Sequence, residues 1–68
     1  MTTEEIKTAI QRRPFHAFEV RLADGSSFQV QNEEHVALHP DGKTFVIFES
    51  AGGYRIVDIP LVTDLSVN

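Results

Sequence analysis

The sequence of 68 residues contains no cysteine and no tryptophan, and it has no long apolar run. Without cysteine, neither a disulfide nor a thiolate-bound metal ion can stabilise the fold. No run approaches the roughly 20 apolar residues that a membrane-spanning helix needs. Glu4 and Glu5 stand where a secretion signal would carry positive charge. We therefore expect a cytoplasmic protein that does not enter a membrane.

Positive charge is also scarce, because six Lys and Arg face ten Asp and Glu, for a net charge of −4. Phosphate groups are bound mainly by Lys and Arg, so this balance argues against a general affinity for nucleic acid or anionic membranes. It leaves open a local nucleic-acid patch with an aromatic ring for base stacking. The arginines available for such a patch are Arg12, Arg13, Arg21 and Arg55. Arg12 and Arg13 have a simpler alternative role as positive charges at a helix end.

Chain length sets a further limit. The chain is expected to form one domain, residues 1–68, and a domain of this size buries only roughly 60% of the surface that its unfolded form exposes. Apolar residues make up 41% of the sequence and include five Phe. We expect the chain to fold, with self-association as a common supplement to a core this small.

The clearest local pattern is a β-hairpin over residues 18–30, where apolar and polar residues alternate on both sides of Asp24-Gly25. Residues that are directly opposed in a hairpin share one face of the sheet. A two-residue turn would oppose apolar to polar residues and so place both kinds on the same face. A three-residue loop, 23–25, instead sets Val20 against Phe28. That loop needs a left-handed residue, so we predict a positive φ at Gly25.

Residues 1–13 are predicted to form a short helix that Pro14 ends, because proline disfavours the α conformation of the residue before it. Thr2 and Glu5 are spaced as a capping box. Because so short a helix is unstable alone, its apolar stripe must dock, either on the chain's own sheet or on a partner subunit. The stripe consists of Ile6, Ala9 and Ile10.

The rest of the β region, residues 18–67 in all, continues with short strands and tight turns. Asp41-Gly42 repeats the turn chemistry of Asp24-Gly25, with glycine where a positive φ is needed. The other expected strands are residues 36–38, 44–49, 54–59 and 63–67, with a helical turn at Pro60-Leu61-Val62 before the last.

One of these strands is apolar on both faces, which predicts that both faces are covered. We expect one face to join the core, and the other to lie under the N-terminal helix or against a second copy of the chain. The expected interface residues are Phe45, Val46, Ile47 and Phe48.

One helix followed by five or six short strands predicts a mainly β fold, a small and strongly bent antiparallel sheet or barrel. This order resembles the Sm-like fold, a relative of the SH3-like barrel, in which a helical turn also precedes the last strand. In the Sm-like family an Asp/Asn-containing loop and a basic element grip uridine-rich RNA. The corresponding segments here are Glu33-Glu34-His35 and Val57-Asp58-Ile59, and neither matches. The resemblance therefore implies the fold and not the RNA site.

A second resemblance is to a group of small bacterial proteins with the pattern Arg-Pro-Phe-x-Pro-Phe, followed by Leu-x-Asp-Gly-Arg-x-Phe-x-Val. Residues 13–18 and 22–30 fit this pattern, with Ala17 in place of the second proline and Ser26 in place of the arginine. The resemblance implies no particular activity.

Catalytic and metal motifs are weak. His35 and His39 are four residues apart, which on a strand is roughly 13 Å, too far for one metal ion. No serine lies in a Gly-x-Ser-x-Gly turn, and Gly52-Gly53 lacks the lysine and the helix of a phosphate loop. We expect no enzyme activity, no cofactor and no metal.

The sequence therefore favours a non-enzymatic protein-interaction module that assembles into a homo-oligomer through a sheet edge or through the two-sided strand. Two alternatives stay open. One is an Sm-like oligomer that binds RNA, which would bind less tightly as salt rises. The other is an adaptor that presents its loops to another protein.

Overall fold

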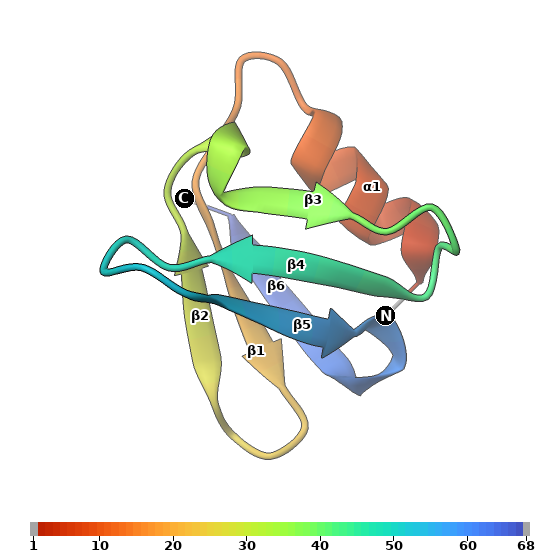
Figure 1. Cartoon of the computed structure of the whole chain (residues 1–68). Coiled ribbons are helices and arrows are strands. Elements are labelled where there is room, and N and C mark those ends of the chain that lie inside the picture. The colour runs from red at the N-terminus through yellow and green to blue at the C-terminus, as the bar shows by residue number, and fades with distance from the viewer. Residues whose placement is uncertain (1, 68) are drawn as a thin grey trace.

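The computed structural model describes residues 2–67 and contains one helix and six strands (Figure 1). The mainly β fold with one N-terminal helix is confirmed. The elements are α1 Thr3–Gln11, β1 Phe18–Leu22, β2 Ser27–Val30, β3 Val36–Leu38, β4 Thr44–Phe48, β5 Tyr54–Asp58 and β6 Val62–Val67. Two short 3₁₀ turns connect strands, η1 Glu33–His35 and η2 Ile59–Leu61.

The strands form two antiparallel sheets of three strands each. The first sheet has the order β2-β1-β6 and the second has the order β3-β4-β5. In Figure 1 the strands of the first sheet run across those of the second, with η1 linking β2 to β3 and η2 linking β5 to β6. Over residues 2–67 the two sheets are not joined into one closed barrel.

The β1–β2 hairpin has the predicted register and turn. Val20 pairs with Phe28, and the Leu22 amide donates to the Ser26 carbonyl at 2.8 Å, which leaves a loop of three residues. Gly25 has φ +91°, in the left-handed region that a Cβ disfavours. The alternation of side chains therefore selects the loop length, and glycine permits it.

Helix α1 begins as predicted and ends two residues early. The Thr2 side chain accepts from the Glu5 amide, and the Glu5 carboxylate accepts from the Thr2 amide, so the capping box is complete. The helix ends at Gln11, because Arg12 is already extended, with ψ 135°. Arg13 still serves the helix end, since its guanidinium donates to the Ile10 carbonyl at 3.2 Å. Residue 1 of the predicted helix lies outside the described residues.

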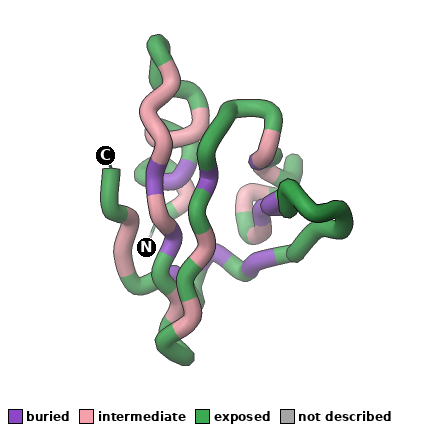
Figure 2. The backbone as a smooth tube through the Cα atoms, turned by 90° about the vertical axis from the view of Figure 1, so that its left-hand side faces the viewer, coloured by how far each residue is buried: buried purple, intermediate pink, exposed green. Residues whose placement is uncertain are grey.

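The apolar stripe of α1 docks on the chain itself. Ile6 is fully buried, and Ala9 and Ile10 pack against the same core. The helix lies beside β3 and near β6 (Figure 1), where it covers the corner between the two sheets. Within residues 2–67, no α-helix covers the opposite corner, where β2 meets β5. Buried segments lie between the sheets, whereas the hairpin turns are exposed (Figure 2). The buried core consists of Ile6, Phe18, Val20, Val30, Val36, Phe45, Ile47, Val57, Ile59 and Val62.

Two local expectations need correction. The helical turn before the last strand is Ile59–Leu61, one residue earlier than predicted, because Val62 is buried as the first residue of β6. Of the two alternatives for covering the outer face of β4, the N-terminal helix is wrong, since α1 lies at the sheet corner and Phe48 is left 43% exposed.

Candidate interaction surface

Strand β4 divides its apolar residues between two faces. Phe45 and Ile47 point inward and are 0% and 2% exposed, so they belong to the core. Val46 is half-buried and Phe48 is exposed on the outer face. Of the four residues expected at an interface, only Val46 and Phe48 can therefore touch a partner directly.

The neighbouring strand β5 extends this outer apolar face. Val46 pairs with Ile56, and Phe48 pairs with Tyr54, so all four side chains share one side of the second sheet. The rings of Phe48 and Tyr54 are 6.3 Å apart between centroids and tilted by 53°. Tyr54 is 63% exposed and Ile56 is 67% exposed. We call Val46, Phe48, Tyr54 and Ile56 the outer patch.

The contribution of Tyr54 and Ile56 was missed at the sequence level, although a signal for it exists. The two residues alternate with Arg55 and Val57, and a hairpin register through the Gly52-Gly53 turn places them opposite Phe48 and Val46. Applying the parity argument used for the first hairpin to this second one would have identified the patch.

The size of the outer patch limits what it can hold. Buried aromatic side chains cover about 150–250 Å² each, so the exposed parts of Phe48 and Tyr54 amount to roughly 200 Å². A stable interface buries about 800 Å² on each partner. The patch alone therefore supports weak and reversible contacts, and tight ones only if neighbouring surface takes part.

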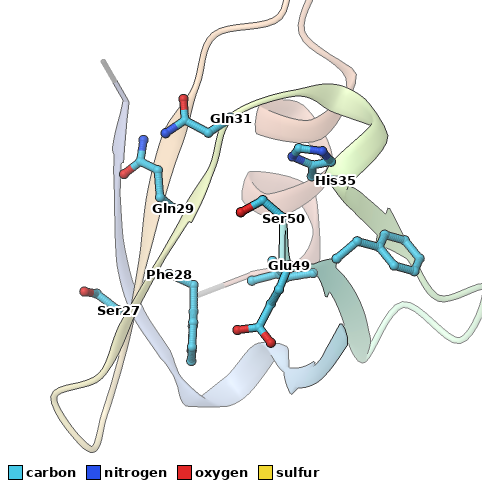
Figure 3. Close-up of a pocket in the computed structure, with 9 residues that line it drawn as sticks. Ser27, Phe28, Gln29, Gln31, His35, Glu49 and Ser50 are labelled. Carbon is cyan, nitrogen blue, oxygen red and sulfur yellow. The ribbon is translucent and has the colours of Figure 1, made fainter. Parts of the chain in front are cut away.

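A shallow groove of about 260 Å³ lies between β2 and the end of β4 (Figure 3). Ser27, Phe28, Gln29 and Gln31 line one wall, and His35, Glu49 and Ser50 line the other. Its volume is below the roughly 300–1,000 Å³ typical of small-molecule pockets. The lining is polar enough to accept hydrogen bonds and too open to exclude water from a reaction.

Arg55 contacts two of the residues that line this groove, Phe28 and Glu49. Its guanidinium lies 4.7 Å from the centroid of the Phe28 ring, and its Nε donates to Glu49 at 3.1 Å. Arg55 is in the second sheet and Phe28 is in the first. The contact therefore holds the two sheets together at the corner that has no helix.

The four arginines of the candidate nucleic-acid patch are spread over separate elements, and three of them are paired with carboxylates. Arg13 contacts Glu33 at 2.7 Å and Arg55 contacts Glu49 at 3.1 Å. Arg12 is exposed at the end of α1. These pairings reduce the positive charge that is available to phosphate.

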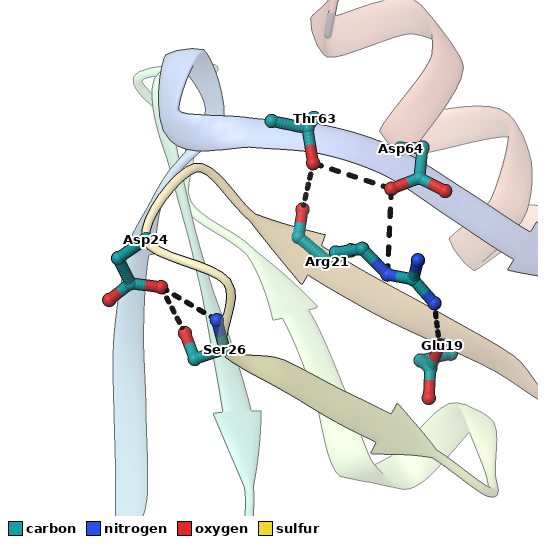
Figure 4. A network of polar contacts seen from close by, with 6 residues as sticks. All are labelled: Glu19, Arg21, Asp24, Ser26, Thr63 and Asp64. Carbon is teal, nitrogen blue, oxygen red and sulfur yellow. Dashed lines mark hydrogen bonds and ion pairs between the residues drawn. The ribbon is translucent and has the colours of Figure 1, made fainter.

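Arg21 belongs to a network of polar contacts (Figure 4). It contacts Glu19 at 3.0 Å and Asp64 at 3.9 Å, while its carbonyl accepts from the Thr63 hydroxyl. The hydrogen bond that the Arg21 guanidinium donates to Glu19, followed by the charge of Asp64, raises the pKa of Arg21. These contacts tie β1 to β6, which is a structural role.

The two Asp-Gly turns have the roles predicted for them. The Asp24 carboxylate accepts from the amide and the hydroxyl of Ser26 (Figure 4), and these bonds lower the pKa of Asp24. The Asp41 carboxylate accepts from the Lys43 amide at 2.7 Å, which lowers the pKa of Asp41. Gly42 has φ +70°. Both carboxylates stabilise turns and neither faces the groove.

Neither a metal-ligand cluster nor a membrane-spanning helix occurs among residues 2–67. Within residues 2–67, no three His, Cys, Asp or Glu side chains come together as metal ligands, and His39 instead accepts from the Asp41 amide at 3.1 Å. Among the same residues, α1 is too short to serve as a membrane-spanning helix.

Comparison with protein-family models, with curated proteins and with solved structures gives no match to this chain. Support for the candidate surface therefore comes from the geometry of this chain alone.

Proposed function

We propose that this chain is a non-enzymatic protein-interaction module that self-associates through the outer patch. The observation that carries the proposal is the exposure of Phe48, Tyr54 and Ile56 side by side on one sheet face, where neither α1 nor the first sheet covers them. Contiguous apolar surface of this kind marks contact sites more often than scattered apolar residues do.

The titratable groups with shifted pKa values lie at structural contacts. Within residues 2–67, the groups with a shifted pKa are Glu5, Arg21, Asp24 and Asp41. Each takes part in a helix cap, a turn or a strand contact, and none lines the groove.

The arrangement of the sheets supports the proposal that the fold is Sm-like. The first sheet contains the last strand beside the first two, the second sheet contains the middle three, and a helical turn precedes the last strand. The resemblance itself rests on the order along the chain, a helix followed by short strands with a helical turn before the last. Self-association at an exposed sheet is compatible with such a fold and does not require an RNA site.

Sedimentation equilibrium between about 10 μM and 1 mM tests self-association. Because the patch is small, we expect the average mass to rise only in the upper part of this range. The double variant Phe48→Thr/Ile56→Thr keeps a β-compatible residue on the surface and should remain monomeric. Val67→Thr, which changes an exposed residue of the first sheet, is the matched control and should associate like the parent. A parent protein that stays monomeric at 1 mM would refute the proposal.

A further inference from the structure

The outer edge of β5 presents unpaired backbone groups. The Glu49 amide donates to the Gly53 carbonyl at 3.1 Å, and the Ile59 amide donates to the Lys43 carbonyl at 2.9 Å. These bonds fix the odd-numbered residues of β5 as the ones bonded to β4, because bonded and non-bonded pairs alternate in antiparallel sheets. The N–H and C=O groups that point away from β4 are therefore those of Tyr54, Ile56 and Asp58.

No strand within residues 2–67 pairs with this edge, because β5 is the last strand of the second sheet. The edge is five residues long, and it is protected neither by an internal proline nor by a bulge in its pairing with β4. Proteins usually protect such edges, and an unprotected edge is a template for an added strand.

The surface next to the edge forms a floor for such a strand. The β1–β2 hairpin passes behind β5 and projects beyond it (Figure 1), and the Ala23 amide binds it to the Leu61 carbonyl at 2.9 Å. Two depressions of about 150 and 160 Å³ lie there and share Leu22 and Leu61. The side chain of Leu61 is 52% exposed, although its backbone carbonyl accepts the hydrogen bond from Ala23. The floor is therefore apolar and open.

The floor carries negative charge near η2. Asp58 borders one depression and Asp24 borders the other. Arg55 borders the same depression as Asp58, but its charge is already balanced by Glu49. A strand lying on the floor would therefore find unbalanced negative charge at the end near η2.

We infer that the β5 edge docks an extended segment of another protein, with two apolar side chains at positions i and i+2 and a Lys or Arg beside them. Alternate side chains of a strand point the same way and are roughly 6.6–6.8 Å apart, so both can enter the adjoining depressions. The side chain of the residue between them points to the opposite face of the sheet, the face on which Ile56 lies. The basic residue meets Asp24 and Asp58, and this charge complementarity selects a basic partner over a second copy of an acidic chain.

The inference is tested with a synthetic peptide in which two valines alternate with threonines and two lysines stand at one end. The peptide is titrated into the ¹⁵N-labelled full chain at about 50 μM, where the outer patch should be unoccupied. The expected result is a saturable shift of the amide signals of Tyr54, Ile56 and Asp58. No shift at 1 mM peptide, or shifts confined to other strands, would overturn the inference.

Two protein variants separate this site from the outer patch. Leu61→Ser changes an exposed side chain of the floor and should weaken peptide binding at least five-fold, and Asp58→Asn should weaken it in the same direction. Phe48→Thr should leave peptide binding unchanged, although it reduces self-association. If Leu61→Ser binds the peptide as the parent does, the inference fails while the proposed self-association stands.

Backbone pairing is tested in the peptide, so that the fold of the protein is not disturbed. N-methylation of alternate residues on one edge of the peptide should abolish binding, whereas N-methylation of the other edge should not, since only one edge faces β5. Equal effects of both peptides would show another mode of contact and overturn the inference.

Discussion

The guanidinium of Arg55 lies 4.7 Å from the centroid of the Phe28 ring and joins the two sheets at the corner that lacks a helix. A cation over an exposed ring contributes about 0.5–1 kcal/mol. Arg55→Met keeps an apolar stem and removes the charge, so we expect the free energy of unfolding in urea to fall by about that amount. Arg21→Met loses ion pairs without losing a ring contact and is the control. Equal stability of Arg55→Met and the parent would show that the contact contributes nothing.

Two phenylalanines of β4 should differ sharply in their effect on stability. Phe45→Ala opens a cavity in the core and should cost about 3–5 kcal/mol, whereas Phe48→Ala on the outer face should cost less than about 1 kcal/mol. Because a domain this small has little stability to lose, Phe45→Leu gives a measurable intermediate if Phe45→Ala does not fold. Urea unfolding of the three variants checks the order. A larger loss for Phe48→Ala than for Phe45→Leu would contradict this assignment of the two faces.

Gly25 should resist replacement for backbone reasons alone. Its φ is +91°, and nothing lies within 4 Å of the position that a Cβ would take, so no clash is involved. Gly25→Ala should lower the free energy of unfolding by about 1–2 kcal/mol, and Gly25→Asn by less, because asparagine tolerates the left-handed region. Thermal unfolding followed by circular dichroism measures both. An unchanged melting temperature for Gly25→Ala would mean that the turn adopts another conformation.

Asp24 should make stability depend on acid pH. Its pKa in the folded chain lies below the usual 3.8, because the Ser26 hydroxyl and amide bind the charged carboxylate. The folded pKa is the lower one, so the carboxylate stabilises the chain above pH 3.8 and this contribution is lost as pH falls through the folded pKa. Asp24→Asn should therefore differ from the parent near neutral pH and converge with it in acid.

Melting temperatures of the parent and Asp24→Asn between about pH 2 and 7 check this expectation over the range in which carboxylates titrate. Asp58→Asn is the control, since the Asp58 carboxylate accepts no hydrogen bond from residues 2–67. A difference between parent and Asp24→Asn that grows as pH falls would have the wrong sign for this mechanism.

The turns and the helix start could be predicted because their causes lie within a few residues. The parity of the first hairpin selects the loop at 23–25, Gly25 permits it, and Thr2 with Glu5 begins the helix. The predicted end of the helix was less accurate. Proline restricts only the residue before it, whereas Arg12 already leaves the helical conformation one residue earlier.

The candidate surface was predicted only in part. The run from Phe45 to Phe48 contains no polar residue, so nothing in it marks which face is outside. Only pairing with β3 and β5, and the position of α1, decide that Phe45 and Ile47 are buried. The docking edge could not be predicted either, because it depends on which strand ends the sheet.

The sequence by itself determined where the chain turns, which residues oppose one another in each hairpin and where the helix begins. Steric limits at glycine and proline and the alternation of side chains act over a few bonds, and the sequence contains all of them. The tertiary structure alone decided which side of β4 faces water and that Arg55 reaches Phe28. Those outcomes depend on how two sheets and one helix share a core too small to cover every apolar face.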